Sequence, residues 1–124
     1  ILSHLIRDAA GGHAADVMRF AHRELFDPLG MRSAVLEADA SGGSVCSSYL
    51  WASPRDWARF GQFVMDDGEV DGQRLLPEGW MDYATTGVAA GGEPEPYGAQ
   101  WWLNQAGDGG RHQLGEQLVG VEAW

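Results

Sequence analysis

The chain has 124 residues, of which 44% are hydrophobic and 21% are charged, so it is long enough to bury a substantial core. Its net charge of −10 repels phosphate backbones and anionic lipids, which argues against nucleic-acid and membrane partners. No apolar run approaches the roughly 18 residues that span a bilayer, and the single cysteine, Cys46, excludes an internal disulfide.

All eight basic residues are arginine, and the chain contains no lysine. Ser-x-x-Lys hydrolases, Schiff-base enzymes and Walker-A nucleotide binders each need a lysine in a defined role. G-x-S-x-G and G-x-G-x-x-G motifs are also absent from the sequence. We therefore predict no catalytic residue, metal ion or cofactor within these 124 residues. The sequence begins inside an apolar pattern without a visible signal peptide, so we expect a piece of a longer protein, of unassigned compartment and oligomeric state.

The first half of the chain favours two helices and a buried turn. Apolar residues at helical spacing predict one helix that ends at Gly11 and Gly12 and a second helix over residues 14–25. Pro28 and Gly30 end the second helix, and residues 26–31 (FDPLGM) are expected to form a buried turn. Short extended segments are expected within residues 32–52.

The clearest local signal is a helix start at Ser53. This serine is a suitable N-cap, Pro54 fits the first helical position, and Asp56 places a carboxylate at the third. The helix is expected to run to Gly68 with a core face made of Trp57, Phe60, Gly61 and Val64. Further along we expect tight turns around residues 69–70, a short helix from Pro77 that carries Trp80, Met81 and Tyr83, a loop over residues 91–96, and a strand over residues 97–103.

The histidines do not form a metal-ligand pattern. His13 and His22 are nine residues apart, which places them on opposite sides of a helix. His4 and Asp8 can face the same way, but two ligands make a poor site. Surface or capping roles are therefore expected for these side chains, and no metal site is predicted.

Two segments are candidates for a binding cleft. Ser47-Ser48-Tyr49 follows a Gly-Gly-Ser loop and sets small hydroxyl groups beside an aromatic ring, which suits either a pocket lining or an ordinary loop. In the expected strand, Trp101 and Trp102 point to opposite faces. One of these two tryptophans should therefore lie away from the core, beside a ligand cleft or another layer of the protein.

Four segments taken together resemble serine hydrolases related to class C β-lactamases and penicillin-binding proteins. Residues 24–31 (ELFDPLGM) are similar to the family's (I/L)F-x-PLGM, and residues 47–61 (SSYLWASPRDWARFG) to its GGL-x-(S/T)-x-RD-x-ARFG. Residues 67–80 (DGEVDGQRLLPEGW) and 97–102 (YGAQWW) resemble two later family segments. The nearest branch is that of esterases and 6-aminohexanoate-dimer (nylon-oligomer) hydrolases. The resemblance covers residues 1–104, as a partial β-lactamase-related domain, and residues 105–124 form a divergent tail.

The resemblance implies a partial β-lactamase-like α+β fold, with helices and part of an antiparallel sheet. It implies hydrolysis of a small-molecule ester or amide (including β-lactams or amide oligomers) through an acyl-enzyme formed on the serine of S-x-x-K, with the lysine and the tyrosine of Y-x-N handling protons. Both motifs are absent here, so we predict a fragment that is inactive alone. The segment that borders the family's substrate cleft corresponds here to Ser47, Ser48, Tyr49 and, less directly, Trp51.

Two other functions remain open from the sequence. The chain could be a non-catalytic ligand-binding or interaction module, which exposed side chains at Trp51 and Trp101 would favour. It could also be a degenerate remnant whose unpaired sheet edges and exposed tryptophans promote aggregation.

Overall fold

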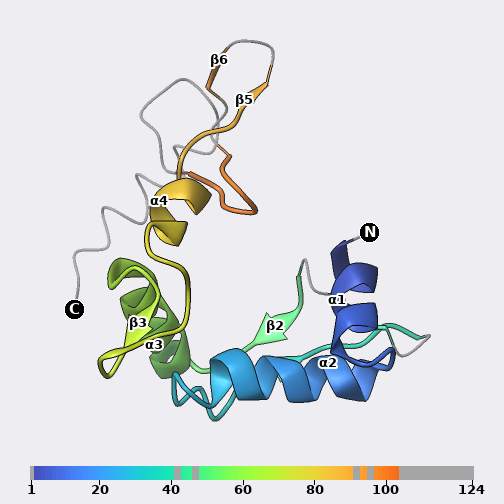
Figure 1. Ribbon diagram of the computed structural model, residues 1–124. Helices are drawn as coiled ribbons and strands as arrows, with labels where there is room; N and C mark the ends of the chain where they lie inside the picture. The colour runs from blue at the N-terminus through green and yellow to red at the C-terminus, as the bar shows by residue number, and fades with distance from the viewer. Residues whose placement is uncertain (1, 41–42, 46–47, 91–92, 95–96, 104–124) are drawn as a thin grey trace. The chain divides into compact units, whose positions relative to one another are not determined.

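The computed structural model describes residues 2–40, 43–45, 48–90, 93–94 and 97–103. The chain divides into two compact units, Ile1–Glu78 and Gly79–Trp124, and each is described by itself. Across the described residues the elements are short helices and two-stranded antiparallel sheets (Figure 1), which confirms the predicted α+β class. None of the helices in these ranges is long and apolar enough to cross a membrane.

Two helices open the first unit, as the apolar spacing predicts. Helix α1 (Leu2–Ala10) ends where Gly11 and Gly12 adopt φ angles of 135° and 93°. Helix α2 (Ala14–Ala21) begins after His13, whose backbone N–H donates a 3.1 Å hydrogen bond to the Asp16 carboxylate. Helix α1 lies against α2 but has no buried residue, so its apolar stripe faces solvent within this unit.

The second helix does not continue as a regular α-helix to Leu25. It passes into a π-helical turn, η1 (His22–Phe26), in which the Asp27 N–H donates to the His22 carbonyl at 2.9 Å. The chain then reverses through Gly30, which has a φ of 67°. Leu29 and Met31 are buried in this turn, which confirms the prediction for residues 26–31.

The extended segments predicted within residues 32–52 are present. Strand β1 (Val35–Leu36) pairs antiparallel with β2 (Leu50–Trp51), with Val35 opposite Trp51 and Leu36 opposite Leu50. Leu50 packs against the core, whereas the Val35 and Trp51 side chains are exposed. One face of this small sheet therefore serves packing, and the other is open to ligands.

Helix α3 (Pro54–Met65) begins as predicted, because the Ser53 hydroxyl accepts a 3.3 Å hydrogen bond from the Asp56 backbone N–H. The predicted core face is confirmed in part, because Phe60 packs against the core cluster and Val64 is half-buried. Trp57 is 42% exposed and Gly61 is exposed, whereas Asp56 and Phe63 are buried. The helix is turned by the hydrogen bonds that draw Asp56 inward, described below, so its buried side is centred on Asp56 and Phe63.

A hairpin follows α3 and completes the first core. Strands β3 (Glu69–Val70) and β4 (Gln73–Arg74) pair antiparallel through Asp71 and Gly72, whose φ angles of 49° and 78° are those of a tight hairpin turn. This confirms the turn prediction for that segment. The buried core cluster of the unit consists of Phe26, Leu29, Met31, Ala34 and Phe63.

The second unit contains helix α4 (Trp80–Ala84), the short helix expected from Pro77, with Met81 and Ala84 buried. Strands β5 (Ala89–Ala90) and β6 (Glu93–Pro94) pair antiparallel, so the predicted loop over residues 91–96 contains a short strand. Residues 91–92 and 95–96 lie outside the described ranges.

The predicted strand over residues 97–103 is wrong. The segment is a tight turn in which Tyr97 forms an antiparallel bridge with Trp102 and the Gly98 N–H donates to the Trp101 carbonyl at 2.7 Å. The Ala99 N–H donates to the Ala84 carbonyl at 2.9 Å, and this bond to the end of α4 bends the chain. Trp102 is nonetheless 62% exposed, as expected for one of the two adjacent tryptophans.

Candidate functional site

The residues predicted to bind substrate gather at the beginning of β2. Ser48 and Tyr49 are exposed and precede the strand, and Trp51 ends it with 60% of its surface exposed. Ser47 and the neighbouring Cys46 lie outside the described residues. Three of the four predicted side chains are therefore accessible in one short stretch of the first unit.

Tyr49 has a backbone conformation that bulky residues seldom adopt. Its φ is 64°, and its side chain is 55% exposed, so no burial of the ring compensates for this strain. The Tyr49 carbonyl accepts a 3.0 Å hydrogen bond from the backbone N–H of Glu37, which fixes the position of the residue beside β1. Exposed residues held in a strained conformation concentrate at functional sites.

Trp51 is held by a residue that sequence reasoning missed. Its indole Nε1–H donates a 2.9 Å hydrogen bond to Oε2 of Glu37. Glu37 lies two positions beyond Val35, which is the cross-strand partner of Trp51. This contact joins residues 14 positions apart, and only the strand register brings them together. In the sequence, the pattern of Val35, Leu36 and Glu37 is typical of a strand. It does not show which other strand pairs with it.

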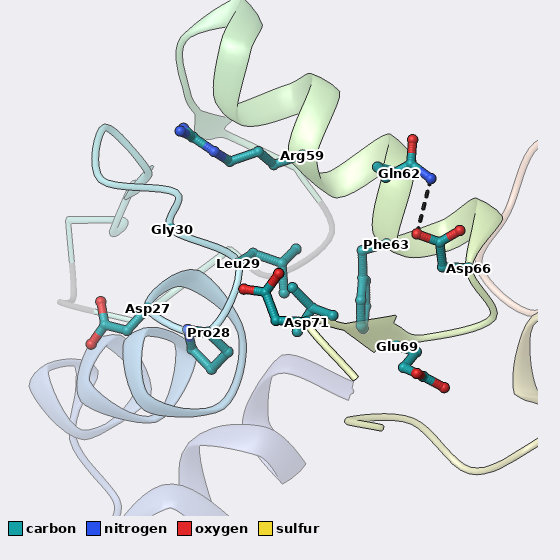
Figure 2. Close-up of a pocket in the computed structure, with 11 residues that line it drawn as sticks. Asp27, Pro28, Leu29, Gly30, Arg59, Gln62, Phe63, Asp66, Glu69 and Asp71 are labelled. Carbon is teal, nitrogen blue, oxygen red and sulfur yellow. Dashed lines mark hydrogen bonds between the residues drawn. The ribbon is translucent and has the colours of Figure 1, made fainter. Parts of the chain in front are cut away.

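A second surface feature is a groove with a volume of about 510 Å³ in the first unit (Figure 2). Its lining combines apolar side chains with one guanidinium and several carboxylates. Figure 2 shows the labelled carboxylates spread along the groove rather than converging, and the Asp66 carboxylate accepts a 2.9 Å hydrogen bond from Gln62. The lining residues are Asp27, Pro28, Leu29, Gly30, Arg59, Gln62, Phe63, Asp66, Glu69, Val70 and Asp71. The groove contains none of the residues predicted to bind substrate.

Asp56 is a charged residue buried in the first unit, where it is surrounded by hydrogen-bond donors. Its carboxylate accepts hydrogen bonds from the Ser33 hydroxyl at 2.6 Å, the Ser33 N–H at 2.8 Å and Arg59 Nη1 at 2.6 Å. The Ser33 hydrogen bonds, and then Arg59, lower the pKa of Asp56 below 3.8 against the opposing effect of desolvation. These hydrogen bonds join the turn at Ser33 to the first turn of α3, so the cluster anchors the helix.

The candidate metal ligands do not come together. In the part of the chain that the structure describes, no three histidine, cysteine or acidic side chains are close enough to hold a metal ion. His22 Nδ1 instead lies 3.1 Å from the Asp27 carboxylate, and its ring packs edge-on against Phe26.

Helices combined with small antiparallel sheets define the chain as an α+β protein. A protein-family model described as Beta-lactamase matches residues 1–121, and the chain therefore belongs to the beta-lactamase family. The fold is consistent with part of a β-lactamase-like α+β domain, and the family is related to serine hydrolases that act on small molecules. No curated protein and no solved structure matches the chain.

Proposed function

We propose that this chain is part of a serine hydrolase that cleaves ester or amide bonds of small molecules through an acyl-enzyme. The observation that carries the proposal is the family match over residues 1–121. The similarity of segments 24–31, 47–61, 67–80 and 97–102 to the esterase and nylon-oligomer-hydrolase branch favours linear esters and amides as substrates. The division into a β-lactamase-related part over residues 1–104 and a divergent tail over residues 105–124 stays a prediction, and the family model itself extends to residue 121.

In this hydrolase the segment before and within β2 borders the substrate. Ser47 and Ser48 supply hydroxyl groups, while Tyr49 and Trp51 supply aromatic surface. The exposure of the Tyr49 and Trp51 rings and the strained backbone of Tyr49 support this role.

The 124 residues by themselves are proposed to be inactive. The acyl-enzyme mechanism of the family needs the serine and lysine of S-x-x-K, and the chain contains no lysine. Incubation of the purified chain with a p-nitrophenyl ester should release p-nitrophenol at the rate of a heat-denatured control. Protein-dependent turnover that is abolished by heat denaturation would contradict the proposed inactivity.

The hydrolase proposal itself is tested on the encoding DNA. We expect the flanking sequence to encode, in frame, an S-x-x-K motif and a Y-x-N-type tyrosine ahead of residue 1. Expression of that longer frame should yield ester hydrolysis that substitution of the S-x-x-K serine by alanine abolishes. Flanking sequence interrupted by stop codons would restrict the family relationship to ancestry.

A non-catalytic ligand-binding module is the second candidate, and the exposure of Trp51 favours it. In that case the chain should bind small aromatic ligands without the missing motifs. Quenching or a shift of tryptophan fluorescence that saturates with ligand, and that is lost in Trp51→Phe, would show ligand binding at this residue. Such binding, together with flanking sequence interrupted by stop codons, would support this function over the hydrolase.

A further inference from the structure

We propose that the exposed face of β1 and β2 recognises a cation, so that the preferred esters or amides carry an ammonium group beside an apolar body. This inference rests on the proposed function, because it names the substrate class of the segment that borders the substrate.

The register of the two strands defines this face. Val35 lies opposite Trp51, and both side chains are exposed, whereas Leu50 on the other face packs against the core. The Glu37 N–H donates to the Tyr49 carbonyl at 3.0 Å and extends the pairing by one step. Since side chains alternate along a strand, Glu37 shares the exposed side with Val35. Tyr49 adjoins this side through its backbone bond to Glu37 and is itself exposed. We call Val35, Glu37, Tyr49 and Trp51 together the β1–β2 face.

A carboxylate is fixed in position on this face. The Trp51 indole donates to Oε2 of Glu37 at 2.9 Å, which holds the carboxylate next to the indole ring. The Trp51 hydrogen bond uses only Oε2, and Glu37 is exposed, so the second carboxylate oxygen, Oε1, lies at the surface. That oxygen is therefore available to a donor brought by a ligand.

An indole ring beside a carboxylate suits one class of ligand better than others. The negative faces of Trp and Tyr rings attract cations, and an ammonium donates a charge-assisted hydrogen bond to a carboxylate. A neutral ligand of the same shape gains only the ring contact. An anionic ligand is repelled by Glu37 and by the net charge of −10. The β1–β2 face should therefore select aromatic or aliphatic amines over matched alcohols and acids.

The test uses the complete 124-residue chain labelled with ¹⁵N-tryptophan. The Trp51 indole N–H signal is identified as the one missing from Trp51→Phe, and it is followed during titration with phenethylamine, 2-phenylethanol or 3-phenylpropionate. We expect the Trp51 signal to move most with the amine, with an affinity roughly tenfold higher than for the alcohol and no saturation with the acid. In Glu37→Gln the preference for the amine should disappear, while weak binding of the aromatic ring remains.

A matched variant separates this site from general attraction of cations to an acidic chain. Glu24→Gln removes one exposed carboxylate from η1, outside the β1–β2 face, and should retain the amine preference. Equal affinities for amine and alcohol in the unmodified chain would overturn the proposal, and this comparison does not depend on any variant being folded. A preference that survives in Glu37→Gln, or that is lost equally in Glu24→Gln, would also overturn it.

The amine titration and the ester-hydrolysis assay test the two proposals separately. If the longer reading frame does not hydrolyse esters but the amine preference is present, the hydrolase proposal fails and the cation site stands. If the longer frame hydrolyses neutral and ammonium-bearing esters equally well and the titration shows no preference, the cation site fails and the hydrolase stands.

Discussion

The Ser33 hydroxyl donates a 2.6 Å hydrogen bond to the carboxylate of Asp56, a residue 23 positions later in the chain. The same hydroxyl oxygen accepts a 2.8 Å hydrogen bond from the Ser53 N–H. Ser53 in turn caps α3 by accepting from the Asp56 N–H. The turn ahead of β1 and the first turn of α3 are therefore joined in one closed set of hydrogen bonds, centred on a buried carboxylate.

The lowered pKa of Asp56 makes part of the stability of the first unit depend on pH. Because the pKa is lower in the folded chain than in the unfolded chain, the contribution is present above the unfolded value of about 4 and is lost as the pH falls through the folded value. Asp56→Asn should therefore be less stable than the unmodified chain at pH 7, and the difference should narrow toward pH 3. Urea unfolding followed by circular dichroism at several pH values measures both quantities.

The matched control is Asp8→Asn, which removes an exposed carboxylate from α1 that pairs with the neighbouring Arg7. This variant should differ little from the unmodified chain at neutral pH, because exposed ion pairs contribute little to stability. A stability gap between Asp56→Asn and the unmodified chain that stays constant from pH 7 to pH 3 would contradict the role assigned to the carboxylate.

Alanine substitutions at two glycines, one within α3 and one shortly after it, should change the free energy of unfolding in opposite directions. Gly68 has a φ of 79°, and a Cβ there would lie 2.5 Å from the Leu76 Cβ, so Gly68→Ala should cost about 1–2 kcal/mol or more in the free energy of unfolding. Gly61 is exposed within the helix, and a Cβ there meets no atom within 4 Å, so Gly61→Ala should gain about 0.5–1 kcal/mol. Chemical denaturation of the two variants measures this difference, and an equal change in both would refute the assignment.

The sequence predicts those parts of the fold that local signals determine. The Ser53 cap and Pro54 define the beginning of α3, and Asp71 with Gly72 defines the hairpin turn, because the information lies within a few residues. Trp57 and Gly61 were wrongly assigned to the core face of α3 because Asp56 is drawn inward by Ser33, which lies outside that local window.

Contacts between residues far apart in the sequence also explain the wrong strand prediction in the second unit and the missed residue of the candidate site. A side chain at Gly98 would lie 2.1 Å from the Ala84 carbonyl oxygen, a close approach that accompanies the turn at residues 97–103 and that strand periodicity does not reveal. The segment that contains Tyr49 and Trp51 was chosen from its residue types and from the family resemblance. Its partner Glu37 depends on cross-strand register, which the sequence of either strand alone does not specify.

The first core should depend strongly on Phe63 and hardly at all on the apolar stripe of α1. Phe63 is 4% exposed and belongs to the core cluster, so Phe63→Ala should cost about 3–5 kcal/mol. Leu5 is 61% exposed, so Leu5→Ala should change stability by less than about 0.5 kcal/mol. Thermal and urea unfolding of both variants test the pair. A large loss in Leu5→Ala would show that the α1 stripe is covered in the folded chain in solution.

The strain at Tyr49 yields a prediction that separates backbone conformation from the loss of the ring. At a φ of 64° glycine is favoured over residues that have a Cβ, so Tyr49→Gly should be more stable than Tyr49→Ala by about 1 kcal/mol. Both variants remove the same exposed ring, so both should bind phenethylamine more weakly than the unmodified chain. Urea unfolding gives the stability difference, and the Trp51 indole titration gives the affinities. Equal stability of the two variants would mean that residue 49 is not held at positive φ, and undiminished affinity in both would remove Tyr49 from the β1–β2 face.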